Sequence, residues 1–250
     1  YFVDPHSTAS QFRWVMAASQ LLAIGLPCLL LAWYFKLRFV TTFSLRVPSA
    51  STTIAALLIA GSIVPIGMFM RDLQAFCLPG LSGDDESLAF QEQLITSGSF
   101  AGIVSVFAVL PGICEEIMFR GFLLAGLRAK LRPLALVAAV GIIFGVFHIH
   151  AEKIALVSLT GALLAYVCVA SGSIFPGILI HIANNGLLLA AFRFEPVRNA
   201  LALSPETKAG EIHFTSRTAC YVLAFVLGLV LLVLNRRRKH SDRDSLQSGS

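Results

Sequence analysis

Charged side chains are scarce in this sequence: Asp, Glu, Lys and Arg together make up 13% of its 250 residues. Soluble domains usually carry about 25% of these residue types. Hydrophobic residues account for 56%, so the sequence lacks the polar surface that a water-soluble domain needs. The composition therefore excludes an ordinary soluble protein and predicts an integral membrane protein with spans of about 20 apolar residues.

Paired cysteines at a metal-binding spacing are missing, because the sequence contains no Cys-x-x-Cys. The five cysteines form an odd, scattered set: Cys28, Cys77, Cys114, Cys168 and Cys220. Four of them lie in apolar stretches and are typical of small core residues, so no disulfide framework is predicted. His-Glu-x-x-His, a common signature of zinc proteases, is also absent.

A basic surface with interleaved aromatic residues is missing too, so no nucleic-acid partner is predicted. Residues 1–11 also lack the basic segment and apolar stretch of a secretory signal peptide. The first residue is Tyr1 rather than Met. We therefore expect either a processed chain or part of a longer one, and a transporter permease is one candidate for a fused or neighbouring module.

Seven apolar stretches are predicted to cross the membrane. They cover residues 14–35, 52–70, 100–127, 134–150, 154–171, 174–192 and 218–235. Pro65 can kink the second stretch. The third is too long for one straight crossing, and Pro111-Gly112 offers a break. The predicted fold class is all-α, a polytopic transmembrane helix bundle of about seven spans.

The charged loops predict an orientation. Residues 36–51, 128–133 and 236–239 are basic, whereas residues 71–99 are polar and acidic. Basic loops face the cytoplasm, and seven spans place these three segments on one side. We therefore expect a multi-pass protein of the cell (inner) membrane, with the N-terminus outside and the C-terminus cytoplasmic.

One charged cluster interrupts the third stretch, where Glu115-Glu116-Ile117-Met118-Phe119-Arg120 follows an uncharged run. A charged side chain at the bilayer centre costs at least about 2.5–3.5 kcal/mol, so such groups need partners or a function. Glu116 and Arg120 are four residues apart on one helical face and can neutralise each other. Glu115 points about 100° away round the helix and has no local partner. It is therefore the first candidate for chemistry.

Two further polar sites interrupt apolar stretches. His148 lies one helical turn from Phe144, which can pack on its ring, and His181 lies one turn from Asn185 on a shared face. At about 1.5 Å per residue, Glu115, His148 and His181 come to similar depths on three separate helices. A structural alternative stays open, because histidine and asparagine in a span can simply hydrogen-bond between helices.

Glu-Glu-x-x-x-Arg, Phe-x-x-x-His and His-x-x-x-Asn, in this order on successive helices, resemble the CPBP family of intramembrane endopeptidases. This is the CAAX protease and bacteriocin-processing (Abi) family, which includes the type II CAAX prenyl endopeptidases. The matching residues are Glu115, Glu116, Arg120, Phe144, His148, His181 and Asn185. The resemblance covers about residues 100–192 and adds nothing on the first two spans or the last.

The resemblance implies a hydrolase with its active site buried in the membrane. It would cleave membrane-associated peptides or proteins, in the manner of CAAX processing or bacteriocin processing. Glu115 would activate a water molecule with help from His148, while His181 and Asn185 would stabilise the oxyanion. The supporting residues would be Glu116, Arg120 and Phe144.

Metal dependence is left open by the motifs. Family members are often described as metalloproteases, and Glu115, His148 and His181 offer three ligands for Zn²⁺ with one open position. The other interpretation is a metal-free site in which Glu115 and His148 polarise water, and the sequence slightly favours it. No cofactor is therefore predicted with certainty, and zinc is the one candidate.

Three regions are expected. Residues 1–99 would form an N-terminal two-span region with an acidic outer loop, 100–192 the CPBP-like catalytic helix core, and 193–250 an outer loop, the last span and a basic cytoplasmic tail. The partners would be the lipid bilayer and a peptide or protein substrate. One alternative function is a non-catalytic membrane scaffold or immunity-type protein whose polar cluster is structural or binds a peptide. A transporter with a proton relay is another, although no inverted repeat supports it.

Overall fold

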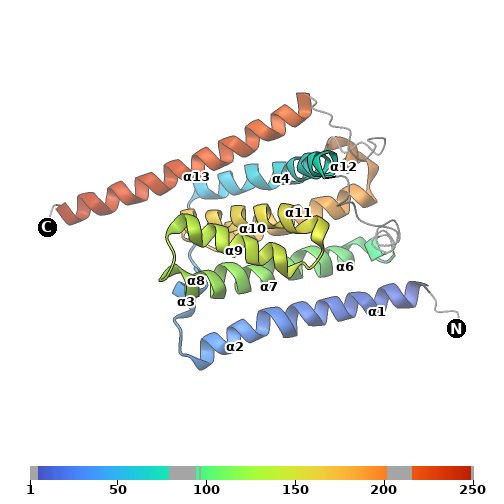
Figure 1. Cartoon of the computed structure of the whole chain (residues 1–250), viewed down its shortest axis with the longest axis horizontal. Coiled ribbons are helices and arrows are strands. Elements are labelled where there is room, and N and C mark those ends of the chain that lie inside the picture. The colour runs from blue at the N-terminus through green and yellow to red at the C-terminus, as the bar shows by residue number, and fades with distance from the viewer. Residues whose placement is uncertain (1–4, 79–93, 96, 202–215, 249–250) are drawn as a thin grey trace.

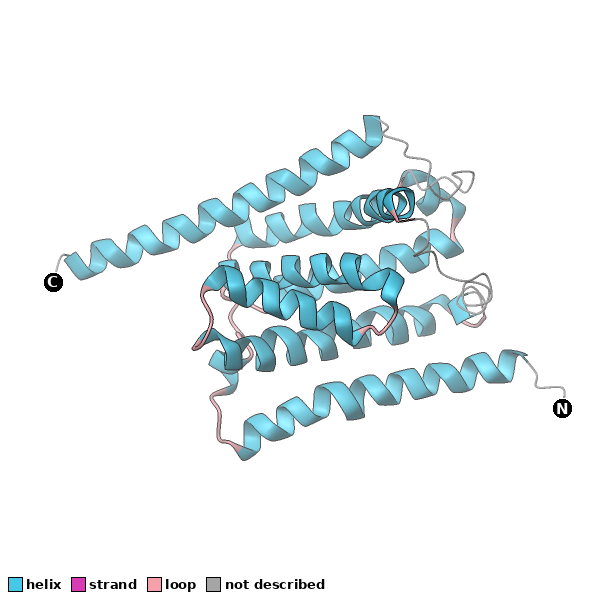
Figure 2. Ribbon diagram, in the orientation of Figure 1, coloured by secondary structure: helices cyan, strands magenta, loops and turns pink. Residues whose placement is uncertain are grey.

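The computed structural model describes residues 5–78, 94–95, 97–201 and 216–248, with the side chains of 5–8 and 238–248 left out of the description. Every ordered element in these ranges is a helix, and the described residues contain no strand (Figure 2). The predicted all-α fold class is therefore confirmed. The predicted division into three regions stays a prediction.

The helices follow one another along the described chain. Their bounds are α1 (Pro5–Ala18), η1 (Ser19–Gly25), α2 (Leu26–Tyr34), α3 (Phe39–Thr42), α4 (Ala50–Cys77), α6 (Phe100–Val104), η2 (Ser105–Val109), α7 (Leu110–Glu116), η3 (Ile117–Leu123), α8 (Leu124–Arg128), α9 (Pro133–Phe147), α10 (Ala151–Ser171), α11 (Phe175–Arg193), α12 (Glu195–Ala200) and α13 (Ser216–Ser248). The three η segments are π-helical, with wider turns than an α-helix.

Six helical stretches of the described chain are long and apolar enough to cross a membrane. They are Ala9–Tyr34, Ala50–Cys77, Phe100–Arg128, Ala151–Ser171, Phe175–Arg193 and Ser216–Arg237. A seventh apolar helix, α9, has 15 residues, or about 22 Å at 1.5 Å per residue. Together they account for the seven predicted stretches, and the chain is a multi-pass integral membrane protein.

Two local predictions need correction or refinement. Helix α9 ends at Phe147, so His148 lies just after the helix rather than inside a span that continues to residue 150. The third span does not break at Pro111-Gly112, because Phe100–Arg128 is one continuous helix. The π-helical turn of η2 directly precedes the helical segment in which Pro111 is the second residue, and this wider turn accommodates a residue without an N–H.

Successive spans run in opposite directions, so the basic segments gather at one end of the bundle (Figure 1). The loop between α2 and α4, the turn between α8 and α9, and the last part of α13 all lie at this end, whereas α1 begins at the other. This is the arrangement that the charge pattern predicts, although it does not by itself say which side of the membrane is cytoplasmic.

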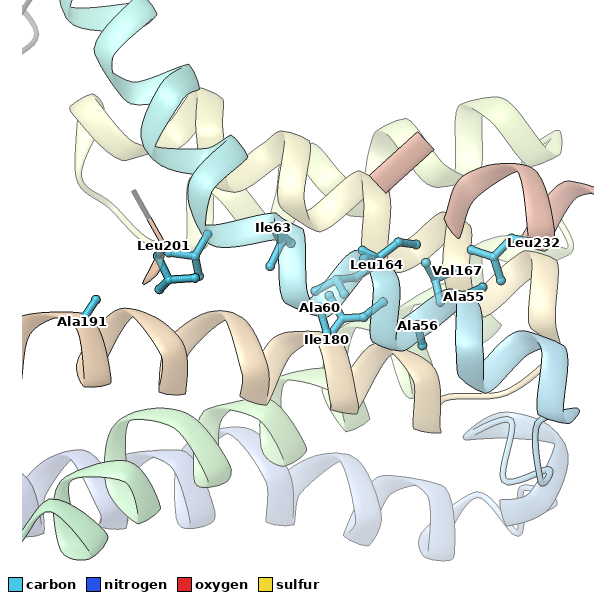
Figure 3. Packing of buried hydrophobic residues seen from close by; sticks show 12 residues of the cluster. Ala55, Ala56, Ala60, Ile63, Leu164, Val167, Ile180, Ala191, Leu201 and Leu232 are labelled. Carbon is cyan, nitrogen blue, oxygen red and sulfur yellow. The ribbon is translucent and has the colours of Figure 1, made fainter. Parts of the chain in front are cut away.

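The main hydrophobic cluster joins α4, α10, α11 and α13 (Figure 3). Small residues such as Ala55, Ala56 and Ala60 let these helices approach closely. Figure 3 also shows α4 changing direction beyond Ile63, next to Pro65, which lies inside the helix. This cluster fixes α10 and α11 against α4, and the cavity described below is lined in part by its residues Ile63, Leu164 and Ile180.

Glycines allow the neighbouring pair α9 and α10 to pack even more closely. A Cβ atom on Gly141 would lie 2.7 Å from the backbone nitrogen of Ala162, and one on Gly161 would lie 2.8 Å from the ring of Phe144. Neither contact is possible for a larger residue without movement of the backbone or the ring. The close approach brings the end of α9, and with it His148, against α10.

Candidate active site

A cavity of about 120 Å³ lies between five helical segments. Its lining combines apolar side chains of α4, α9, α10 and α11 with polar ones of α7, α10, α11 and the turn after α9: Ile63, Glu115, Phe144, His148, Val157, Thr160, Leu164, Ile180, His181, Asn184 and Asn185. The four residues predicted to be catalytic therefore line one cavity, although they come from α7, α11 and the end of α9. Their convergence is a geometric finding, and their catalytic roles stay a prediction.

Glu115 is buried, with 6% of its surface exposed. Its Oε1 accepts a hydrogen bond of 2.9 Å from Nε2 of Gln20, a residue of the first span. Its Oε2 has no hydrogen-bond partner among the described residues, and the nearest basic atom recorded is Nε2 of His181 at 3.9 Å. One oxygen of the carboxylate is thus held while the other is left open.

Glu116 has a different environment, because it does not line the cavity. Its Oε1 accepts from Nη1 of Arg120 at 2.7 Å, as the spacing of four residues predicts. Nδ1 of His181 lies 3.0 Å from the same oxygen. The side chains of Glu116 and Arg120 are both completely buried, and with His181 they form a buried polar network. Oε2 of Glu116, like that of Glu115, has no hydrogen-bond partner among the described residues, so the two carboxylates differ in their contact with Arg120 and in their access to the cavity.

Arg120 joins this network to two more helices. Its Nη2 donates to the carbonyl oxygen of Gly161 in α10 at 2.9 Å. Its Cζ lies 4.4 Å from the centre of the Phe144 ring in α9, a cation–π distance. One guanidinium therefore contacts η3, α9 and α10 at once, and it fixes the walls of the cavity relative to each other.

His148 is half-buried, and its ring is fixed on two sides. Its Nδ1 lies 2.9 Å from the carbonyl oxygen of Phe144, and the two rings meet edge to face at 4.8 Å, as predicted. A carbonyl oxygen only accepts, so Nδ1 carries the hydrogen and Nε2 of the neutral ring is an acceptor. The imidazole can therefore take a hydrogen bond from a molecule in the cavity.

The turn after His148 has an unusual backbone. Ile149 has a positive φ of 65°, a rare conformation for a β-branched residue, and its side chain is 85% exposed. Backbone strain of this kind costs on the order of 1–3 kcal/mol and gathers at functional sites. The strained residue directly follows His148, in the turn that ends α9.

Asn185 is held by two amide contacts. Its Nδ2 donates to the carbonyl oxygen of Phe107 in η2 at 3.2 Å, and its Oδ1 accepts from Nδ2 of Asn184 at 3.1 Å. An amide nitrogen has two hydrogens, so one N–H of Asn185 is left to donate. The orientation of this side chain is therefore set before any substrate binds.

Three polar residues near the site were not predicted from the sequence: Gln20, Thr160 and Asn184. Gln20 could have been noticed as an amide inside an apolar span, the same signal that drew attention to Asn185. Asn184 was visible as the neighbour of Asn185. Thr160 carried no signal, because threonine is common in membrane helices.

The three predicted zinc ligands, Glu115, His148 and His181, line the same cavity. In the part of the chain that the structure describes, no three His, Cys, Asp or Glu side chains come together closely enough to hold a metal ion. Nδ1 of each histidine is engaged with the protein, so Nε2 is the ring nitrogen that remains for another ligand. Zinc binding stays a prediction, and no chemical step is assigned to it.

Comparison with known families adds a finding independent of this geometry. Residues 97–187 match the family described as type II CAAX prenyl endopeptidase Rce1-like. No curated protein and no solved structure matches the chain. The matched segment contains all three sequence motifs, from Glu115 to Asn185, but not Gln20. Residues 97–187 are therefore similar to the Rce1-like type II CAAX prenyl endopeptidases, in agreement with the resemblance of the three motifs.

Proposed function

We propose that this chain is an intramembrane endopeptidase that cleaves membrane-associated peptides or proteins with a water molecule activated by Glu115. The observation that carries the proposal is a buried Oε2 without a hydrogen-bond partner on a glutamate that lines the cavity, because Oε2 of Glu116 is also unpartnered but Glu116 does not line it. Glu115 lines the cavity together with His148, His181 and Asn185. Unpaired carboxylate oxygens are unfavourable in an apolar interior unless they have a function.

The first step is activation of water. Oε2 of Glu115 accepts a proton from a water molecule in the cavity while Nε2 of His148 accepts its second hydrogen bond. A positioned general base contributes typically about 10²–10⁴-fold to a rate. The attacking oxygen then forms a bond to the carbonyl carbon of the substrate peptide.

The second step is stabilisation of the negative charge on the carbonyl oxygen. Asn185 contributes its remaining N–H. His181 contributes Nε2–H when its ring is protonated, because its Nδ1–H already donates to Glu116. Donors that are fixed before the reaction stabilise such an oxyanion without reorganising. The proton held by Glu115 finally passes to the leaving amine as the peptide bond breaks.

The Glu116–Arg120 network supports these steps without contacting the substrate. It holds His181 through Oε1 of Glu116, and it ties α10 and α9 to the same guanidinium. For the orientation, the gathering of basic loops at one end supports our proposal that this end is cytoplasmic and that the N-terminus lies outside. The substrate class proposed is peptides or proteins of CAAX-processing or bacteriocin-processing type.

The test uses the full chain purified in detergent and a library of quenched peptides, including peptides with lipidated C-termini. Wild type should cleave at least one peptide, and Glu115→Ala should cleave none. Ser62→Ala is a matched control, because the buried Ser62 hydroxyl bonds only to carbonyl oxygens of its own helix. Normal turnover in that variant and loss in Glu115→Ala would assign the activity to the cavity.

The opposite result would favour the non-catalytic alternative. His148 and Asn185 both bond to backbone carbonyl oxygens, which is what structural polar residues between membrane helices also do. A folded wild-type protein that binds library peptides but cleaves none would identify a peptide-binding scaffold and overturn the proposed protease.

A further inference from the structure

The first span contributes a side chain to the site although it lies outside the matched segment. Gln20, in η1, is buried with 5% of its surface exposed. Its Nε2 donates to Oε1 of Glu115 across 95 positions of sequence. It is the one hydrogen bond recorded for the Glu115 side chain among the described residues.

This contact lies between two other attachments of the first span. Towards its beginning, Nη1 of Arg13 donates to the backbone oxygen of Ser97 at 2.7 Å and to its Oγ at 3.0 Å. Towards its end, a Cβ atom on Gly25 would lie 3.1 Å from Sγ of Cys114. The π-helical η1 is thus seated closely on α7, with Gln20 opposite Glu115.

The surroundings of Gln20 are unfavourable for a glutamine whose role is only structural. Oε1 of Gln20 is buried and makes no hydrogen bond in the described part of the chain. A buried unpaired polar atom costs about 1–3 kcal/mol, and an apolar residue of the same shape would avoid that cost. The amide is therefore explained by what its N–H does rather than by packing.

We propose that Gln20 is a positioning residue for Glu115: it holds Oε1 of the carboxylate, so that Oε2 is the oxygen offered to water. Gln20 does not line the cavity, so it acts through Glu115 and not on the substrate. The inference rests on the proposed function of Glu115. It extends the catalytic apparatus beyond residues 97–187 to the first span.

The physical reason is the freedom of a carboxylate. The terminal torsion of glutamate is broad and roughly two-fold, so without a donor either oxygen can turn towards the cavity. A hydrogen bond to an ionised acceptor is about twice as strong as one between neutral groups. It therefore selects one orientation of the group, which is what a general base at a fixed distance needs.

The experiment compares Gln20→Leu with the matched control Gln74→Leu. Gln74 also donates through Nε2, but to the backbone oxygen of Glu152. Gln20→Leu should lower kcat about 10–100-fold, the range known for side chains that orient metal ligands, with KM within about twofold of wild type. Gln74→Leu should leave both values close to wild type. If Gln20→Leu gives no folded protein, Gln20→Met serves the same purpose.

A second measurement does not depend on turnover. Thermal unfolding is measured for wild type, Gln20→Leu, Glu115→Ala and the double variant, and the changes should be non-additive because the two side chains are in contact. Wild-type kcat in folded Gln20→Leu, or additive changes in stability, would overturn the inference. If the wild-type chain cleaves no peptide, the proposed function fails. The unfolding measurements then test the contact between Gln20 and Glu115 alone: non-additive changes support this contact, and additive changes refute it.

Discussion

Two neighbouring carboxylates, Glu115 and Glu116, occupy opposite kinds of environment in one helix. Glu116 is completely buried, and one of its oxygens contacts both Arg120 and His181. Glu115 lines a cavity and is held through one oxygen by a neutral amide, and the nearest basic atom recorded among the described residues is Nε2 of His181 at 3.9 Å. Two residues that look alike in the sequence therefore have different surroundings, although the ring of His181 lies between them.

The difference shows how a membrane protein can keep charge in an apolar bundle. The Glu116–Arg120 pair is neutral as a unit, and losing either partner leaves a buried charge, so its role is structural. Glu115 is not paired with an arginine and lines the cavity, so its Oε2 can accept a proton from a molecule that enters there. Removing the carboxylate of Glu116 should therefore lower the stability of the fold, whereas removing that of Glu115 should lower the rate of cleavage.

The largest expected effect comes from Glu115→Gln. This change keeps the size of the side chain and an oxygen that can accept from Gln20, but it removes the base. We expect peptide cleavage to be abolished while the unfolding temperature stays close to that of wild type, because the hydrogen bond to Gln20 is kept. Turnover near the wild-type rate in the purified variant would show that Glu115 is not the base.

The next effect concerns stability. Glu116→Ala and Arg120→Ala should each lower the free energy of unfolding by roughly 3–5 kcal/mol, since each strands the charge of the partner. The double variant should lose less than the sum of the two. Unfolding in detergent, measured for the complete double-mutant cycle, checks this, and additive losses would mean that the two groups do not stabilise each other in solution.

The smallest of these effects is expected at Asn185. Asn185→Ala should lower kcat by about 10²–10³, the scale for removing one oxyanion donor, with a small change in unfolding temperature.

The amount of metal bound by the protein should be the same in this variant as in wild type and well below one per chain, and chelators should lower the activity only weakly. Stoichiometric zinc that is lost on changing His148 or His181, with activity restored by added zinc, would instead establish a zinc enzyme.

The local part of the site could be predicted from the sequence because it depends on helical spacing. The pairs Glu116–Arg120 and Phe144–His148 lie four residues apart, and the structure confirms both contacts. The scarcity of charge also made each ionised residue conspicuous within the apolar stretches. The number of spans and the helical fold class followed from the same composition.

Contacts between distant segments could not be predicted in this way. The bond from Gln20 to Glu115 depends on which face of the first span packs against α7, and spacing within one helix says nothing about that. The motifs also do not predict that Oε1 of Glu116 contacts both Arg120 and His181. The resemblance to the family assigns His181 to the oxyanion and not to an ion pair. Likewise, an apolar run up to His150 gives no sign that the helix ends at Phe147.

The short α9 has a consequence for the surrounding lipid. Its length of about 22 Å falls well short of a hydrocarbon layer of about 30 Å, and the chain turns at His148 and Ile149 instead of continuing. A membrane adapts to such hydrophobic mismatch by thinning locally, at a cost of fractions of a kcal/mol per ångström. The lipid headgroups and their water then sink towards the end of α9. Acyl-chain length in the host bilayer should thus govern how readily water reaches His148.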